Sequence, residues 1–188
     1  TVANRTAGSL TFRAALAVAG AANTNKQYLH YDLAIPGNDT LMLPCSIPLA
    51  ATDVLRTYAS AVGLSVNVSG RRITAVNNGY AYKVLAQLAC AATTLEDVYT
   101  VPSGKAAEIA TVIIANRSAS SVAFRLSLAI AGAADDNKQY THYDLVIPGN
   151  DSIEINDRFD LAATDVLRVY AASANLSVNV IGREVTNG

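Results

Sequence analysis

The sequence predicts an all-β protein made of two tandem antiparallel β-sandwiches of jelly-roll-like form, and three observations lead to this prediction. A long stretch of the chain occurs twice, short segments alternate between apolar and polar residues, and turn residues separate these segments at close intervals. No long segment has the apolar period of an amphipathic helix. Many short strands with turn signals between them are typical of sandwiches and barrels.

The duplication is the strongest of these signals. Residues 25–39 recur almost unchanged at 137–151, and residues 3–74 align with 115–186 without a gap, at a constant offset of 112 residues. Roughly three in five of the aligned residues are identical. The period is too long for a solenoid repeat, so we interpret it as the duplication of a whole domain.

The join between the two copies is expected near residue 78. Asn77-Asn78-Gly79 is a tripeptide of turn-forming residues, of the kind that marks a linker. This boundary predicts a first module at 1–78 and a second at 79–188.

The second module supplies the more complete set of predicted strands. They are expected at 82–89, 97–101, 107–116, 121–131, 139–147, 152–159, 165–171 and 176–182. The first module starts only at the third of these, so its first two strands are missing from the sequence. Because an open sheet edge recruits other chains, we expect the edge near Thr1 to be completed by residues upstream or by a neighbouring protein. The 188-residue chain alone is then expected to be poorly stable or to self-associate.

The repeated strand at 28–35 alternates with a period of two. Its apolar face is predicted to carry Leu29, Tyr31, Leu33 and Ile35, and its other face Tyr28, His30, Asp32 and Ala34. Pro36-Gly37 and Pro148-Gly149 then end the strands in a turn, because proline presets φ at its first central position and glycine tolerates a positive φ at the second. The pattern also predicts that Phe12 and Phe124, and Tyr31 and Tyr143, are buried at equivalent positions.

Composition narrows the classes of function. The net charge is −1, and no basic cluster stands out beyond Arg71-Arg72, so a nucleic-acid partner is not expected. The small-residue run at 14–22 is too short to cross a membrane, so no membrane partner is expected either. Cys45 and Cys90 fit no metal motif and are expected to be unpaired thiols. No signal peptide is recognisable and residue 1 is not methionine, which suggests a fragment or a processed chain.

The candidate interaction surface lies on the two copies of the repeated strand. It consists of Tyr28, His30, Asp32, Tyr140, His142 and Asp144. A histidine and an aspartate two positions apart share one face of a strand, which could orient the imidazole or begin a metal site. A third ligand at a suitable spacing is missing, and the simpler interpretation is an outward polar face with satisfied hydrogen bonds. We therefore expect no metal and no cofactor.

Other polar residues have a structural interpretation. Arg13, Arg56, Arg125 and Arg168 are predicted to form cross-strand ion pairs with aspartates such as Asp32 and Asp53. No nucleophile elbow, phosphate-binding loop or dinucleotide fingerprint is present, so no catalytic residues and no enzymatic activity are predicted.

Five motifs carry a resemblance to a known family. They are Tyr99-Thr100-Val101-Pro102-Ser103-Gly104-Lys105, Ala115-Asn116-Arg117, Phe124-Arg125, Asn137-Lys138-Gln139-Tyr140 and Leu161-Ala162-Ala163-Thr164-Asp165-Val166. With these motifs the chain resembles the small β-sandwich domains of virion structural proteins from tailed bacteriophages, including phages of cyanobacteria. The likeness runs over about 84–185 and again over 3–74.

The resemblance implies a non-enzymatic structural protein located in the virion, which is assembled in the host cytoplasm. It implies a capsid decoration or cement protein, or a tail, baseplate or fibre component, that contacts other virion proteins or copies of itself. Small outward residues such as Ala15, Ala17, Ser127 and Ala129 would allow close packing against such a partner. The alternative is a receptor- or carbohydrate-binding module of a phage fibre, in which exposed Tyr28 and Tyr140 stack on a host-surface glycan.

Overall fold

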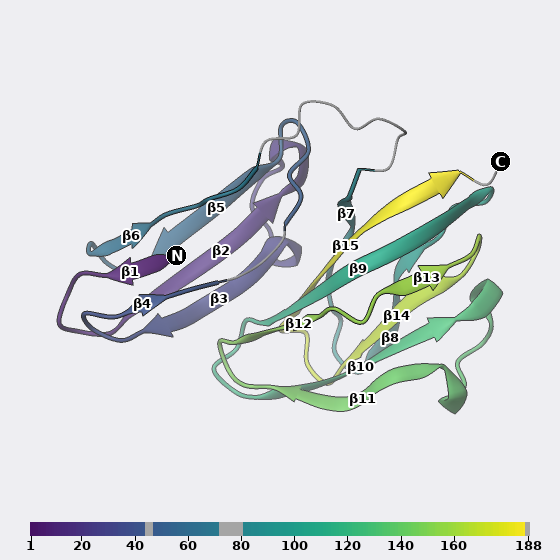
Figure 1. Ribbon diagram of the computed structural model, residues 1–188. Coiled ribbons are helices and arrows are strands. Elements are labelled where there is room, and N and C mark those ends of the chain that lie inside the picture. The colour runs from purple at the N-terminus through teal and green to yellow at the C-terminus, as the bar shows by residue number, and fades with distance from the viewer. Residues whose placement is uncertain (44–46, 72–80, 187–188) are drawn as a thin grey trace.

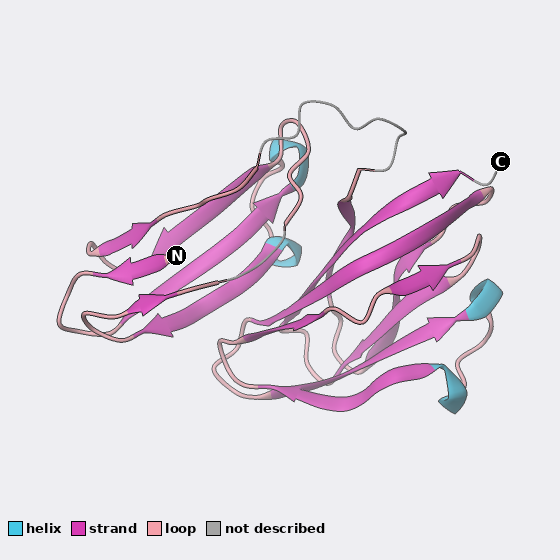
Figure 2. Cartoon of the chain, viewed as in Figure 1, coloured by secondary structure: helices cyan, strands magenta, loops and turns pink. Residues whose placement is uncertain are grey.

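The computed structural model of the chain is all-β, as the sequence predicts. It describes residues 1–43, 47–71 and 81–186. Within these ranges the only helical segments are single 3₁₀ turns: η1 (Val18–Gly20), η2 (Asn25–Gln27), η3 (Ile130–Gly132) and η4 (Asn137–Gln139). Figure 2 shows how strands account for most of the rest.

The strands of the first repeat form two three-stranded antiparallel sheets. They are β1 (Val2–Asn4), β2 (Leu10–Ala17), β3 (Tyr28–Ile35), β4 (Thr40–Leu41), β5 (Val54–Ala59) and β6 (Leu64–Val66). One sheet has the order β4-β1-β6 and the other the order β3-β2-β5. Strand β1 therefore has a partner on both sides, and the prediction of an open edge near Thr1 is wrong for this strand. The reason is that the chain returns twice beside β1, as β4 and as β6.

The second repeat contains counterparts of the same two sheets. Its strands are β7 (Lys83–Ala89), β8 (Thr94–Thr100), β9 (Lys105–Asn116), β10 (Val122–Ala129), β11 (Tyr140–Ile147), β12 (Ser152–Ile155), β13 (Phe159–Leu161), β14 (Val166–Ala171) and β15 (Leu176–Thr186). One sheet has the order β12-β9-β15-β7 with β13 also paired to β9, and the other has the order β11-β10-β14. Strand β8 lies along the free side of β14.

The two repeats share the same strand register. Val2 pairs with Leu41 as Ile114 pairs with Ile153, and the β2–β3 and β10–β11 pairs shift register at corresponding places. The eight predicted strands are found, although β15 extends to Thr186 and β13 was missed. The predicted linker Asn77-Asn78-Gly79 and the boundary near 78 lie outside the described residues.

The turn after the repeated strand has its left-handed residue one position beyond the glycine. The positive φ belongs to Asn38 (55°) and Asn150 (56°), not to the preceding glycines. Gly37 and Gly149 are needed because their Cα atoms lie against the backbone of Ala7 and Ala119, where a Cβ would overlap the carbonyl group. The backbone of the turn thus packs directly against the backbone of a neighbouring loop, which only glycine permits at this position.

Of the aromatic residues predicted to be buried, the phenylalanines lie in the cores of the two repeats and the tyrosines do not. Phe124 is fully buried among Val122, Leu126 and Leu167, and Phe12 is buried at the equivalent position, so the prediction for these rings is confirmed. The prediction for the tyrosines is wrong, because Tyr143 is 57% exposed and Tyr31 is only half-buried. A bulge in the strand, described below, turns both rings outward.

The sheet that contains β9 and β15 is covered on both faces. On one face Val112, Ile114, Val178 and Val180 contribute to the core of the second repeat. On the other, Ile113 and Ile181 pack with Phe12 and Leu29 of the first repeat. In Figure 1 this sheet accordingly lies between β2–β3 on one side and β10–β11–β14 on the other. The second repeat thus helps to cover the apolar residues of the first.

One end of the same sheet carries a charge cluster centred on Glu184. Its carboxylate accepts hydrogen bonds from Lys105 (2.6 Å), Lys83 (3.1 Å) and Tyr99 (3.1 Å). The bond from Lys105, together with those from Lys83 and Tyr99, lowers the pKa of Glu184 to about 2, against the opposing effect of desolvation.

This lowered pKa predicts an acid-sensitive contribution to stability. Because the folded-state pKa lies below the unfolded-state value of about 4.3, the contribution is present above that pH and is lost as the pH falls toward 2. We expect Glu184→Gln to lower the free energy of unfolding by up to about 3 kcal/mol at pH 7, and by progressively less below pH about 4. Denaturant titrations of both proteins at several pH values measure this. A pH-independent difference would contradict it.

Candidate interaction surfaces

The residues singled out from the sequence lie on β3 and β11, and a bulge divides them between two faces. Asp32 and Asp144 have left-handed φ values of 49° and 51°. A bulge sets two residues opposite one and interrupts the alternation of the strand. His142 stacks beside the core ring of Phe124, with 6.5 Å between centroids, whereas Asp144 binds Arg125 on the other face. The prediction that histidine and aspartate share a face is therefore wrong.

The outward face carries a repeated arginine cluster. Arg13 donates two hydrogen bonds to Asp32, at 2.6 and 2.8 Å, and its guanidinium lies 4.1 Å from the ring centre of Tyr31 and 5.0 Å from that of Tyr58. The hydrogen bond to Asp32 raises the pKa of Arg13 above its already high value. These contacts confirm the predicted ion pair between Arg13 and Asp32, and they place the guanidinium against the rings of two tyrosines.

The second repeat builds the same cluster. Arg125 donates to Asp144 at 2.6 and 3.2 Å and lies 4.1 Å from the ring centre of Tyr143 and 4.9 Å from that of Tyr170. The hydrogen bond to Asp144 raises the pKa of Arg125 in the same way. The cluster is thus a property of the repeat, encoded by identical residues at an offset of 112.

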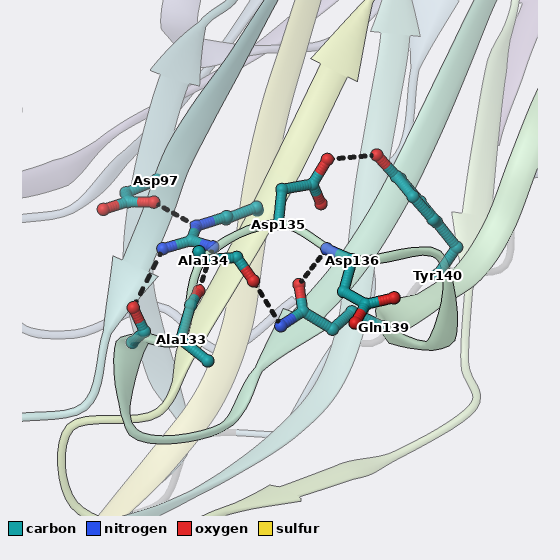
Figure 3. Close-up of polar contacts among 9 residues, drawn as sticks. Asp97, Ala133, Ala134, Asp135, Asp136, Gln139 and Tyr140 are labelled. Carbon is teal, nitrogen blue, oxygen red and sulfur yellow. Dashed lines mark hydrogen bonds and ion pairs between the residues drawn. The ribbon is translucent and has the colours of Figure 1, made fainter.

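Tyr28 and Tyr140 are not the exposed rings that the sequence suggested. Both are half-buried, and each meets the next tyrosine edge-on, Tyr31 at 4.7 Å and Tyr143 at 5.1 Å between centroids. The hydroxyl of Tyr140 donates to Asp135 at 2.7 Å (Figure 3). In these clusters the exposed rings are instead Tyr58 and Tyr143, which the sheet edge and the bulge bring outward.

The other two predicted arginines behave differently in the two repeats. Arg168 donates through Nε to Asp97 of β8 at 2.7 Å and through its amino groups to the carbonyl oxygens of Gly132 and Ala133 (Figure 3). Arg56 keeps the carbonyl partners, Gly20 and Ala21, but pairs with no described carboxylate. Asp53 pairs with no arginine among the described residues and instead accepts hydrogen bonds from the backbone N–H groups of Ala19 and Ala50.

Besides the apolar packing, hydrogen bonds join the two repeats, and most of them are accepted by backbone carbonyl groups of the first repeat. Asn179 donates to the carbonyl oxygen of Tyr28 at 3.0 Å, Gln87 to that of Leu16 at 2.9 Å, and Ser177 to that of Asn25. Ser177 and Asn179 are fully buried. Ser177 and Asn179 therefore each have a hydrogen-bond partner, which offsets the cost of burying their polar groups.

Sequence reasoning missed this role of Ser177 and Asn179. Their alternation with Leu176, Val178 and Val180 predicts a strand with one face in solvent, and this prediction of a strand is confirmed. The polar face is nevertheless covered by the first repeat. A period of two reports which residues share a face, but it does not report what that face meets.

His30 also belongs to this contact. It is 7% exposed, and its Nδ1 lies 2.7 Å from the hydroxyl oxygen of Ser152 in the second repeat. Burial lowers the pKa of His30, and the nearby Asp151 only partly opposes this. His142, at the equivalent position, lies beside Thr141 and 3.6 Å from Asp157, within its own repeat.

The surface of the first repeat that packs on the second has a counterpart in the second repeat, and this counterpart is exposed. A hollow of about 520 Å³ is lined by Leu128, Ile130, Ala133, Lys138, Gln139, Tyr140 and Thr141. Leu16 and Tyr28, whose carbonyl oxygens accept the bonds from the second repeat, correspond to Leu128 and Tyr140. Thr141 is exposed where its counterpart Leu29 is 2% exposed, so the residue type follows the difference in burial.

Within the described residues, no group of three or more His, Cys, Asp or Glu side chains is placed to hold a metal ion. Cys90 is a buried free thiol, and burial raises its pKa to about 12, which keeps it protonated. Cys45 lies outside the described residues. The described part of the chain has no helix long and apolar enough to span a membrane.

No family model, curated protein or solved structure matches the chain. The contacts between and around the two repeats are therefore the basis for proposing a function.

These contacts predict different effects for the two histidines. His30→Ala removes a buried partner of Ser152 and is expected to lower the free energy of unfolding by about 1–3 kcal/mol, whereas His142→Ala is expected to lower it by about 1 kcal/mol or less.

The burial of His30 also predicts a dependence of stability on pH. Because burial lowers the pKa of His30 below its usual value of about 6.5, the histidine is protonated at a higher pH in the unfolded chain than in the folded one. Stability should therefore fall as the pH drops below about 6.5, and less so in His30→Ala. Thermal melts at two pH values for the three proteins test this, and equal pH dependence would contradict it.

Proposed function

We propose that the chain is a non-enzymatic structural component of a tailed-phage virion that acts through protein–protein contacts. In the particle it would serve as a capsid decoration or cement protein or as part of the tail, baseplate or fibre. Its partners would be other virion proteins or further copies of itself. The proposed location in a phage particle rests on the family resemblance. The proposed contact-forming role rests on the packing of the two repeats against each other.

The observation that carries the proposal is the packing of the first repeat on the second. The second repeat already has a core of its own around Phe124, yet the opposite face of its β9–β15 sheet is also buried. In this second contact the side chains of Gln87 and Asn179 donate hydrogen bonds to backbone carbonyl oxygens of the first repeat, which are acceptors that every residue type supplies. A module that can bury both faces of one sheet is suited to layered assemblies.

Mass spectrometry of gradient-purified particles tests the location. Peptides of this chain should be recovered in amounts comparable with other structural proteins and should remain after a high-salt wash. Recovery only from the soluble host fraction would contradict the virion proposal.

Sedimentation of the isolated chain, with hydrogen exchange at residues 1–20, tests the contact-forming role. A monomer at all concentrations, with no particle partner, would contradict that role.

The alternative is a glycan- or receptor-binding module, and one feature favours keeping it. The exposed rings of Tyr58 and Tyr143 lie beside fixed Arg–Asp pairs, and a hollow of about 190 Å³ lined by Arg13, Asn23, Tyr28, Arg56 and Tyr58 opens on the same face. Apolar rings with polar neighbours are a common arrangement for sugar binding. A glycan array with Tyr58→Ala and Tyr143→Ala as paired controls distinguishes this function, because specific binding should be lost in one of these variants.

A further inference from the structure

In the part of the chain that the structure describes, the outer edge of β5 is open, whereas the equivalent edge of β14 is covered. No described strand pairs with the side of β5 that faces away from β2. Val54 is 40% exposed in β5, and its identical counterpart Val166 is 4% exposed in β14. Leu55 is half-buried where Leu167 is fully buried. The two repeats therefore present the same strand with and without a neighbour.

Strand β8 is the neighbour in the second repeat. Its flanking residues are hydrogen-bonded to the β14 segment at both ends, Thr93 N–H to the oxygen of Ala171 and Val101 N–H to the oxygen of Asp165, at 2.8 and 2.9 Å. Val98 and Val101 are buried in the core. The backbone and the apolar side chains of β8 thus both contribute to covering this edge.

A charge pair fixes the same contact. Arg168 donates through Nε to Asp97 of β8. The counterpart Arg56 is held in the same way by two carbonyl groups, but its Nε donates to no described residue. The first repeat therefore keeps an arginine oriented by its own loop, without the carboxylate that this arginine meets in the second repeat.

We propose that the open edge of β5 binds an extended acidic peptide segment in the manner of β8, with a carboxylate on Arg56 and apolar residues over Val54 and Leu55. The partner is a protein segment that adds a strand by main-chain hydrogen bonds and is selected by its aspartate. This inference does not rest on a location in a virion.

The direction of the free backbone groups can be read from the ladder. Ser60 N–H donates to the oxygen of Thr11 on β2. Alternation along an antiparallel strand then directs the N–H groups of Leu55, Thr57 and Ala59 away from β2. The carbonyl groups of Ala171 and Asp165, at the positions equivalent to Ala59 and Asp53, indeed face β8.

This direction of the backbone groups provides a test variant. Thr57 is exposed and its N–H group points away from β2, so a proline at this position removes an outward donor at a strand edge, where proline is tolerated.

A labelled synthetic peptide with the sequence of residues 92–102 tests the proposal by fluorescence anisotropy against the 188-residue chain. Saturable binding is expected, weakened about fivefold or more by Arg56→Gln in the protein or by asparagine in place of the aspartate in the peptide. Thr57→Pro should weaken binding at least as strongly while leaving the thermal melt cooperative. Arg168→Gln is the matched control and should leave the affinity unchanged.

Hydrogen exchange identifies where the peptide binds. Bound peptide should slow exchange at 54–59 and leave 166–171 unaffected. Three results would each overturn the proposal. They are the absence of saturable binding, an affinity that neither Arg56→Gln nor Thr57→Pro changes, and protection of residues 166–171 alone. The last result would mean that the peptide replaces β8 in the second repeat.

Discussion

Replacement of Phe124 by alanine is expected to lower the free energy of unfolding by about 3–5 kcal/mol. The ring is fully buried and packs with Val122, Leu126 and Leu167 in the larger of the two cores. Truncation removes its apolar contacts and leaves a cavity between two sheets that are tied by long ladders and can collapse only in part. Denaturant-induced unfolding followed by circular dichroism measures the loss.

Two further variants make this result specific. Tyr143→Ala removes a ring of similar size from the same repeat, but this ring is 57% exposed, and a loss of about 1 kcal/mol or less is expected. Phe12→Ala empties the equivalent position in the first repeat, whose core is shared with Ile113 and Ile181 of the second. A cost for Phe124→Ala no larger than that for Tyr143→Ala would contradict the assigned core.

Replacement of Gly149 by alanine is expected to destabilise the protein by about 3 kcal/mol or more. A Cβ at this position would overlap the carbonyl group of Ala119 and crowd the nitrogen of Ser120. Both obstacles are backbone atoms, so no side-chain rotation relieves the overlap. The loop is itself held by Asn150 N–H, which donates to the oxygen of Ser118 at 2.7 Å. Thermal unfolding of the purified variant measures the effect.

The neighbouring residue provides the matched control. Asn150 has the left-handed φ of the turn, at 56°, and glycine adopts this conformation without strain. Asn150→Gly is therefore expected to change the free energy of unfolding by less than about 1 kcal/mol. If Gly149→Ala were tolerated and Asn150→Gly were severe, the turn would depend on conformation at residue 150 and not on close approach at residue 149.

The sequence alone determined the local β structure of this protein. Alternation at 122–128 and 176–180, bounded by turn residues, correctly predicted strands and the burial of Phe12 and Phe124, because each pattern reflects one strand and its immediate face. The Arg13–Asp32 and Arg125–Asp144 pairs also followed from the sequence, since neighbouring strands of one repeat supply both partners.

Only the tertiary structure decided which polar residues face water and which face the other repeat. The bulges at Asp32 and Asp144 separate each histidine from its aspartate, and strand periodicity gives no sign of a bulge. His30 and His142 have the same local sequence, yet only His30 reaches Ser152 across the contact between the repeats. Identical residues such as Val54 and Val166 differ in exposure because burial depends on what lies beside a strand, and a neighbour distant in the sequence leaves no mark on the strand's own pattern.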